Sequence, residues 1–395
     1  MQSMKDKVAI IGMGCCKFGE RWDSDTEDLL VESCYEAFED AGVESKDIQA
    51  AWFGTTQQAT GQVLAHAIKT EYIPITRVEN ACATGTDAII NACNAVAAGV
   101  YDLVLVAGVE KLKDSGVGYL TGGGGQPSAQ ISPAVPPPAQ FAMAANRYFH
   151  RYGLSYEEGK KVLGKIAVKN HWNGARNPKA HFQREVTLDQ VVNAPIQAYP
   201  LGLYDCCGVS DGSAAMVITR PELAKNFRKD YILLKGYGLS VGGQQGMLRD
   251  YYDFTHFDET RAAAKMAYAM AGITNPRDEV DLAEVHDCFT ITELVIYEDM
   301  GWSREGHSKE DIDSGFFELK PGETGGLPVN PDGGLKCFGH PIGASGIRMV
   351  YEVYKQLQGK AGPRQIKNPR IGATQNLGGR PGSFTGAVSL WGLPA

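Results

Sequence analysis

The residues that could carry out chemistry stand in short stretches far apart in the chain. The first is ENACATGTDAI, residues 79–89, in which Cys82 lies between small residues directly ahead of a predicted helix. A thiolate is a strong nucleophile, and the free N–H groups and dipole of a helix N-terminus stabilise it. Judged alone, Cys82 fits a nucleophile and a small packed cysteine equally well, since cysteine is among the most buried residue types.

Two further stretches carry histidine. In GHPIGASG, residues 339–346, His340 lies on a predicted turn into a helix, where a neutral imidazole can take the proton of Cys82. In EVHDCF, residues 284–289, His286 and Cys288 end a predicted strand, and ligands bind at the carboxyl ends of strands in open parallel sheets. The alternatives are an incidental turn histidine, a hydrogen-bonded core histidine and a buried cysteine.

The last stretch, NLGGRPG at residues 376–382, is a predicted glycine turn. Its backbone N–H groups can donate to a developing oxyanion, although the motif is weak by itself. The adjacent cysteine pairs, at 15–16 and 206–207, lack the CxxC spacing of zinc sites, so no bound metal is expected.

Composition excludes several function classes. The chain has 395 residues, a net charge of −8 and no block of Lys and Arg, which argues against nucleic-acid binding. No run of 18 apolar residues indicates a membrane span. The N-terminal residues lack the pattern of a signal peptide, so the nine cysteines are expected to be reduced thiols of a cytoplasmic protein.

Predicted strands and helices alternate along the chain, which indicates a parallel α/β sheet. A strand over 7–14 leads to a helix over 24–42, which Ser24 or Asp25 can cap and Gly42 ends. A second half begins near residue 231 and repeats the order of the first, so an internal duplication is a hypothesis. Further strands are predicted at 49–55, 101–110, 210–220, 231–243, 281–289, 369–379 and 384–392, and helices at 83–98, 259–273 and 290–301. Residues 334–359 are predicted to be a Gly-rich turn that opens a long helix.

Residues 115–205 interrupt this alternation. A Gly- and Pro-rich loop over 121–140 precedes helical patterns at 142–153 and 155–178. Because the segment is rich in aromatic residues, it is predicted to be an inserted cap and not a linker.

Together and in this order, the four stretches resemble the thiolase superfamily over the whole chain. HDCF, YDCCGVSDGSAA and NPKAHFQ resemble the sterol-carrier-protein type of thiolase. The resemblance implies an α/β thiolase fold, with two similar βαβαβαββ halves in a five-layered α/β/α/β/α sandwich. It also implies an N-terminal half at 1–118 and 204–228, an inserted loop domain at 119–203 and a C-terminal half at 229–395.

The resemblance also implies roles for single residues. Cys82 matches the acylated nucleophile, and His340 matches the base that activates it and later helps to bind the thioester oxygen. His286 stands where many thiolases have an asparagine, and it would complete the oxyanion site for the enolate. The backbone N–H groups of Cys82 and Gly378 would form a second oxyanion hole.

One position departs from the common pattern. Many thiolases have a second catalytic cysteine where this chain has Asn376. In the sterol-carrier type the HDCF cysteine supplies the acid/base function, so Cys288 is the candidate. The implied reaction is thiolytic cleavage of a 3-oxoacyl-CoA, or the reverse Claisen condensation, through acyl-Cys82. CoA and acyl-CoA would be substrates, with no permanently bound cofactor.

Two other functions stay open. One is a condensing enzyme similar to ketoacyl synthase or hydroxymethylglutaryl-CoA synthase, which lacks a cysteine at the HDCF position. The other is a non-catalytic thiolase-like subunit that binds CoA or lipid. The sub-family resemblance further implies a homodimer core, a small zinc-ribbon/OB-fold partner protein and an aromatic or branched acylsuccinyl-type substrate.

Overall fold

The computed structural model describes residues 3–115, 135–243, 252–323 and 325–394. Its centre is a nine-stranded sheet in the order β3-β2-β4-β7-β1-β8-β11-β10-β9. The first half of the chain supplies the first five strands of this order, and β1 joins them to β8 of the second half. The strands are β1 (Ala9–Cys15), β2 (Ala50–Gly54), β3 (Ile75–Val78), β4 (Leu103–Glu110), β7 (Gly212–Thr219), β8 (Ile232–Val241), β9 (Leu282–Val285), β10 (Ile371–Arg380) and β11 (Ser383–Gly392).

The sheet is mixed, whereas the alternation of strands and helices predicted a parallel sheet. β2 pairs in parallel with β3 and β4, and β9 pairs in parallel with β10. β7 and β11 run antiparallel to their neighbours. The short connection between Arg380 and Ser383 turns β10 directly back into β11, and β7 follows the inserted segment and not a crossover helix.

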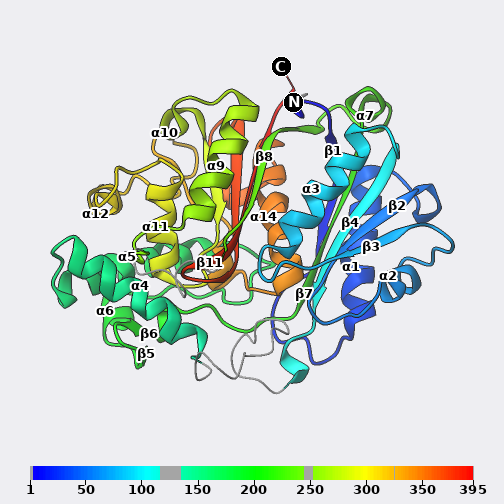
Figure 1. Cartoon of the computed structure of the whole chain (residues 1–395). Helices are drawn as coiled ribbons and strands as arrows, with labels where there is room; N and C mark the ends of the chain where they lie inside the picture. Colours follow the sequence, from blue (N-terminus) through cyan, green and yellow to red (C-terminus); the bar gives the residue numbers. More distant parts are fainter. Residues whose placement is uncertain (1–2, 116–134, 244–251, 324, 395) are drawn as a thin grey trace.

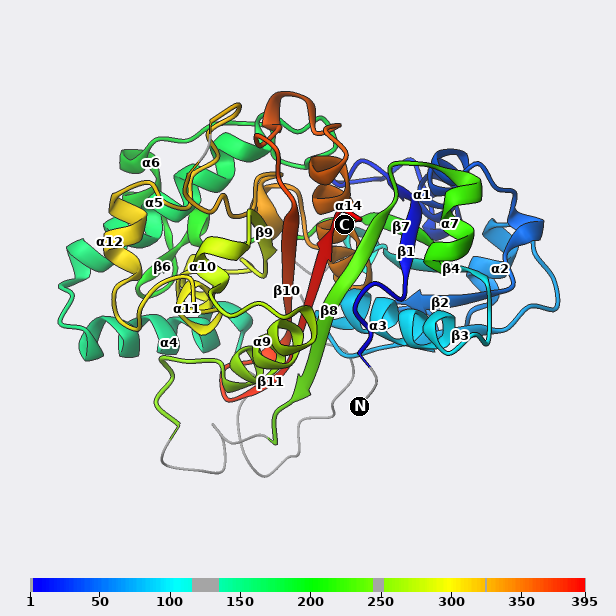
Figure 2. The ribbon, with the colours of Figure 1, turned by 90° about the horizontal axis from the view of Figure 1, so that it is seen from above.

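Helices pack on the faces of this sheet and form separate layers (Figures 1 and 2). α3 (Thr84–Ala97) and α14 (Ile342–Leu357) contact each other between the two halves. α1 (Thr26–Ala41) covers β1 and β7 on one outer face, and α9 (Asp258–Ala271) covers β8 and β11 on the other. The α/β architecture expected from the sequence is confirmed, with helices on both faces of the sheet. Smaller helices are α2 (Gln62–Ala67), α7 (Pro221–Phe227), α10 (Pro276–Glu279), α12 (Ser308–Asp313) and α13 (Gly334–Cys337).

Local signals in the sequence set the ends of α1. Asp25, and not Ser24, caps the helix, because its carboxylate accepts a hydrogen bond from the N–H of Asp28. The Asp28 carboxylate in turn accepts from the N–H of Asp25, and the two bonds form a capping box. Gly42 ends it with φ of +69°, a left-handed conformation that glycine adopts readily.

The inserted segment folds against the second half. It contains α4 (Pro137–Arg151), α5 (Tyr156–Gly174), α6 (Leu188–Val192) and a hairpin of β5 (Ile196–Ala198) and β6 (Leu201–Gly202). α4 and α5 contact α11 (Thr290–Asp299), and Phe141 stacks on Phe289 with ring centroids 4.5 Å apart. The two predicted helices are confirmed, while most of the predicted Gly- and Pro-rich loop lies outside the described residues. The proposed division into three units stays a prediction.

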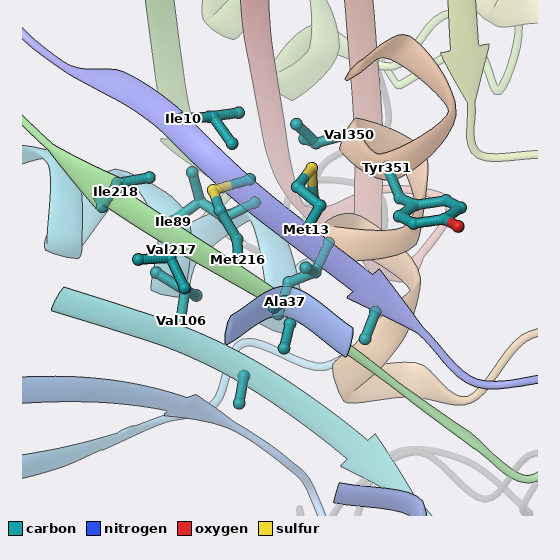
Figure 3. Packing of buried hydrophobic residues seen from close by; sticks show 14 of the residues in the cluster. Ile10, Met13, Ala37, Ile89, Val106, Met216, Val217, Ile218, Val350 and Tyr351 are labelled. Carbon is teal, nitrogen blue, oxygen red and sulfur yellow. The ribbon is translucent and has the colours of Figure 1, made fainter. Parts of the chain in front are cut away.

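Buried apolar side chains hold the layers together. In Figure 3, Ile10 and Met13 of β1 and Met216 of β7 lie near Val350 of α14. Burying each such side chain contributes about 1.5–3 kcal/mol, so α14 is fixed firmly against the sheet. In the part of the chain that the structure covers, no helix has the length and apolar character needed to cross a membrane.

Candidate active site

The N-termini of α3 and α14 meet, and this brings Cys82 and His340 together. Glycines permit the approach: a Cβ at Gly343 would lie 2.3 Å from the carbonyl oxygen of Gly54, and one at Gly85 would lie 2.8 Å from the carbonyl oxygen of Gly343. Any larger residue would push the helices apart. The small residues on both sides of Cys82 and His340 therefore position the site through packing.

The turn that presents Cys82 is held in an unusual conformation. Ala81 has φ of +48°, which is rare for a residue with a side chain and costs on the order of 1–3 kcal/mol. The Thr84 hydroxyl donates to the carbonyl oxygen of Ala81 at 2.5 Å and accepts from the backbone N–H of Asn80 at 2.9 Å. These bonds offset the strain and fix the direction of the cysteine.

Three of the predicted site residues converge. One ligand-type atom each of Cys82, His286 and His340 lie within 4.8 Å of one another, although their positions span most of the chain. The two imidazole rings have centroids 5.2 Å apart and meet edge to face at 83°. Cys82 is partly exposed while both histidines are buried, so Cys82 is the most accessible residue of the cluster.

The hydrogen bonds of His340 leave one of its ring nitrogens free. Its Nδ1 lies 2.7 Å from Oγ of Ser345, and that hydroxyl donates its own hydrogen to the carbonyl oxygen of Pro341 at 2.9 Å. The Ser345 oxygen therefore accepts from Nδ1–H, which leaves the lone pair on Nε2. Nε2 has no hydrogen-bond partner among the described residues. Burial lowers the pKa of His340 to about 3, so the imidazole is neutral at physiological pH.

His286 carries its proton on the opposite ring nitrogen. The side-chain amide of Asn376 donates to Nδ1 of His286 at 3.1 Å, and the Thr86 hydroxyl donates to the amide oxygen of Asn376 at 3.2 Å. Because the NH₂ group of Asn376 can only donate, Nδ1 of His286 accepts this bond and neutral His286 carries its proton on Nε2. Burial and the neighbouring His340 lower the pKa of His286.

A buried ion cluster lies behind the histidines. Arg348 of α14 bonds to Glu284 at 2.6 Å and to Asp332 at 2.5 Å, and all three side chains are fully buried. The charge of Arg348 adds to burial in lowering the pKa of both histidines. Sequence reasoning did not single out Arg348, but a charged residue in an apolar helix that is expected to be buried was a usable signal.

Glu110 is a second residue that sequence reasoning missed. It ends the apolar strand β4, accepts hydrogen bonds from the backbone N–H and hydroxyl of Thr56, and is 1% exposed. Burial raises its pKa to about 7. Burial is the largest cause of the raised pKa of Cys82, and the negative charge of Glu110 is the second. An acidic residue that ends a buried strand was the available signal.

Cys288 is buried beside the cluster. Its sulfur lies 3.7 Å from the hydroxyl oxygen of Thr292. Burial raises the pKa of Cys288, and the nearby thiols of Cys207 and Cys82 raise it further. Cys288 is therefore within electrostatic reach of Cys82 and is a protonated thiol at rest.

The final glycine segment forms the end of a strand and the start of a turn, as the predicted strand over 369–379 implies. β10 continues to Arg380, so residues 376–379 are strand, because they pair with β11 up to the turn. A backbone hydrogen bond from Gly379 acts on the sulfur of Cys82. A Cβ at Gly378 would lie 2.2 Å from the carbonyl oxygen of Asn80, so this glycine packs against the nucleophile turn. Gly379 is an additional donor, and the donor role of Gly378 stays a prediction.

The resting pair of Cys82 and His340 is neutral, and this predicts how the alkylation rate of Cys82 changes with pH. Burial, then Glu110 and Glu79, raise the pKa of Cys82 to about 12. Alkylation by iodoacetamide should therefore keep accelerating from pH 6 to 9, up to about tenfold per unit, because only the thiolate reacts.

Glu110 modifies this profile. As Glu110 ionises near pH 7, its negative charge raises the pKa of Cys82 and so slows the increase of the alkylation rate with pH. Glu110→Gln removes this charge, so its alkylation rate should increase more steeply with pH above pH 7. A rate that is already constant at pH 7 would show a preformed thiolate–imidazolium pair and contradict the assignment.

Comparison with known proteins gives consistent matches over the chain. The family model "Thiolase, N-terminal domain" matches residues 8–222, and "Thiolase C-terminal domain-like" matches residues 242–388. An acetyl-CoA acetyltransferase from Methanothermobacter thermautotrophicus is 38% identical over 398 residues, which cover 98% of this chain and 100% of that protein.

Two further relatives and one solved structure are similar. Benzoylsuccinyl-CoA thiolase subunit BbsB from Thauera aromatica is 32% identical over 388 residues, covering 95% of this chain and 96% of that protein. Human sterol carrier protein 2 is 30% identical over 94% of this chain and 70% of its own length. The solved structure of the Ltp2-ChsH2(DUF35) aldolase matches with a TM-score of 0.84, 26% identity and coverage of 99% of this chain and 98% of that chain.

Proposed function

The chain belongs to the thiolase superfamily and is an acyltransferase of the acetyl-CoA acetyltransferase type, with sterol-carrier-protein-type relatives, and on this premise we propose its reaction. The reaction is CoA-dependent thiolytic cleavage of a 3-oxoacyl-CoA, or the reverse Claisen condensation, through acyl-Cys82. The observation that carries the proposal is the convergence of Cys82, His286 and His340 within 4.8 Å.

In the first half-reaction, Nε2 of His340 takes the thiol proton as the sulfur of Cys82 bonds to C3 of the substrate. Donors at the nucleophile turn, the backbone N–H groups of Cys82 and of Gly378 or Gly379, receive the charge on the C3 oxygen. When the C2–C3 bond breaks, its electron pair passes into an enolate. The protonated Nε2 of His340 and Nε2–H of His286 donate to the enolate oxygen, and Cys288 protonates C2.

In the second half-reaction, the Cys288 thiolate takes the proton of the CoA thiol. The CoA sulfur then attacks the acyl carbon, and Cys82 leaves and recovers its proton from His340. One 3-oxoacyl-CoA and one CoA thus give two acyl-CoA products, and each side chain returns to its first state. CoA is a substrate, and no permanently bound cofactor takes part.

Mass spectrometry of the protein after incubation with acyl-CoA tests the proposal. An acyl adduct should form on Cys82 and disappear when free CoA is added. Folded protein that binds CoA without an adduct would favour the non-catalytic subunit. Carbon–carbon cleavage without an adduct would favour an aldolase, the activity named for the similar Ltp2-ChsH2(DUF35) structure. A ketoacyl-synthase-like enzyme would form the adduct without needing Cys288.

A carboxylate-bearing acyl chain, such as an acylsuccinyl group, is the substrate class that we propose. The name of BbsB, a relative, includes benzoylsuccinyl-CoA, whose acyl chain carries such a carboxylate. Lys336 is 2% exposed, and its ammonium has no hydrogen-bond partner among the described residues. The charge of Lys336 lowers the pKa of Cys206 and Cys207, and the charge of Cys82 raises the pKa of Cys207. An unpaired buried ammonium is costly, so a substrate carboxylate is a favourable partner.

Replacing Lys336 with methionine tests this substrate class. Because a hydrogen bond between charged groups contributes about 1.5–3 kcal/mol, kcat/KM for a 3-oxoacyl-CoA that carries a carboxylate should fall about 10–100-fold. Activity on acetoacetyl-CoA should stay within about threefold, as should both activities of Lys165→Met, which changes an exposed lysine. Equal losses on the two substrates would contradict the proposal.

We also propose that a small zinc-ribbon/OB-fold protein assembles with a homodimer of this chain. Support comes from the similar solved structure, in which Ltp2 is paired by name with ChsH2(DUF35), and from the subunit designation of BbsB. Co-purification and turnover with and without the candidate partner test this. Full CoA-dependent activity of the chain alone would exclude a required partner.

A further inference from the structure

The cluster of Cys82, His286 and His340 is close to a zinc site in composition. A thiolate and two imidazoles are preferred zinc ligands, and the three ligand-type atoms lie within 4.8 Å of one another. With zinc–ligand bonds of about 2.0–2.3 Å, tetrahedral ligand atoms lie roughly 3.3–3.6 Å apart. Small side-chain movements would therefore bring the three atoms around one ion.

A zinc ligand needs a lone pair on the nitrogen that faces the ion. A histidine that binds zinc carries its proton on the other ring nitrogen and donates it to an acceptor. His340 meets this condition, since Nδ1–H donates to Ser345 and Nε2 is free. His286 does not, because its Nδ1 accepts from the Asn376 amide and its proton is on Nε2.

We infer that Asn376 decides between two uses of this cluster. By donating to Nδ1, it holds His286 as a hydrogen-bond donor toward an oxyanion and keeps it from acting as a metal ligand. Thr86 contacts the other side of this amide, where its hydroxyl bonds to the amide oxygen while the NH₂ group faces His286. Asn376 is a positioning residue that protects the nucleophile from zinc. This inference goes beyond the proposed reaction and needs only the hydrogen bonds of the cluster.

Asn376→Asp reverses the arrangement with almost no change in size. The carboxylate accepts where the amide donates, so it draws the proton of His286 to Nδ1 and frees Nε2. A carboxylate behind a histidine is the arrangement found in many zinc sites, and such outer partners change metal affinity by about 10–100-fold. The variant should bind one Zn²⁺ or Co²⁺ per chain at least about tenfold more tightly than the unchanged protein. The Cys82 proton passes to solvent on binding.

The experiment is a titration with Co²⁺, followed by the thiolate-to-cobalt absorption, and competition with Zn²⁺. Asn376→Asp combined with Cys82→Ala should lose both the absorption and the added affinity. Equal affinity of the unchanged protein and Asn376→Asp, or binding that survives Cys82→Ala, would overturn the inference.

A second measurement uses the unchanged protein. With ¹⁵N-labelled histidine, the nitrogen shifts should show His286 protonated at Nε2 and His340 at Nδ1, and His286 protonated at Nδ1 would also overturn the inference. Neither measurement needs turnover. A protein without thiolase activity would therefore refute the proposed function and leave this test intact.

Discussion

Replacing Cys82 with alanine should lower kcat/KM for thiolysis at least about 10⁴-fold, because the variant cannot form the acyl-enzyme. The remaining groups, His340, His286 and the backbone donors at the turn, would still bind and polarise a thioester. They cannot supply the covalent step that divides the reaction into two easier ones. Steady-state thiolysis of acetoacetyl-CoA, with the adduct measured by mass, reports both consequences.

Cys93→Ala is the matched control for this variant. Cys93 lies further along α3, is fully buried and belongs to the apolar core, so its loss tests the effect of removing a thiol from the same helix. The control should keep its activity within about threefold and lose only about 1 kcal/mol of stability, as most core substitutions do. Substantial thiolysis by Cys82→Ala would remove acyl-Cys82 from the mechanism.

Replacing Cys288 with alanine should separate the two chemical roles. Acylation of Cys82 by acetyl-CoA should remain within about tenfold of the unchanged rate, because His340 activates the nucleophile and CoA is a good enough leaving group to depart as a thiolate without a proton from Cys288. Carbon–carbon bond turnover should fall about 10²–10⁴-fold, the usual loss when a general acid/base is removed. Exchange of the acetyl-CoA methyl protons with deuterated water isolates the proton transfer at C2, and it should fall by the same factor.

Cys207→Ala controls for the neighbouring thiol. The backbone N–H of Cys207 donates to the carbonyl oxygen of Cys288 at 2.9 Å, and the two residues lie opposite each other beside the bridge between Cys206 and Phe289. Normal proton exchange in Cys288→Ala with loss in Cys207→Ala would transfer the acid/base role to Cys207. Normal exchange in both variants would assign it to another group.

Much of the fold was predictable from local patterns. The apolar run of β1, the capping box and Gly42 of α1, and the helices of the inserted segment depend on neighbours in sequence, so composition and periodicity report them. Strand direction was predicted wrongly for β7 and β11, because pairing partners are chosen by three-dimensional connections. The strand predicted over 369–379 is confirmed, and pairing with β11 keeps its two adjacent glycines, Gly378 and Gly379, in the strand.

By itself, the sequence determined the chemical types at the site: a thiol, two imidazoles and a second thiol. Cys82 and His340 lie in stretches of small residues that let backbones approach, and His286 and Cys288 lie at the end of a predicted strand. Only the tertiary structure decided how each group carries its proton. His286 is protonated at Nε2 because the amide of Asn376, 90 positions away, donates to its Nδ1. Burial, with a smaller contribution from the charge of Arg348, keeps both imidazoles neutral. Protonation depends on distances of a few ångströms and on burial, and residues that are remote in sequence set both.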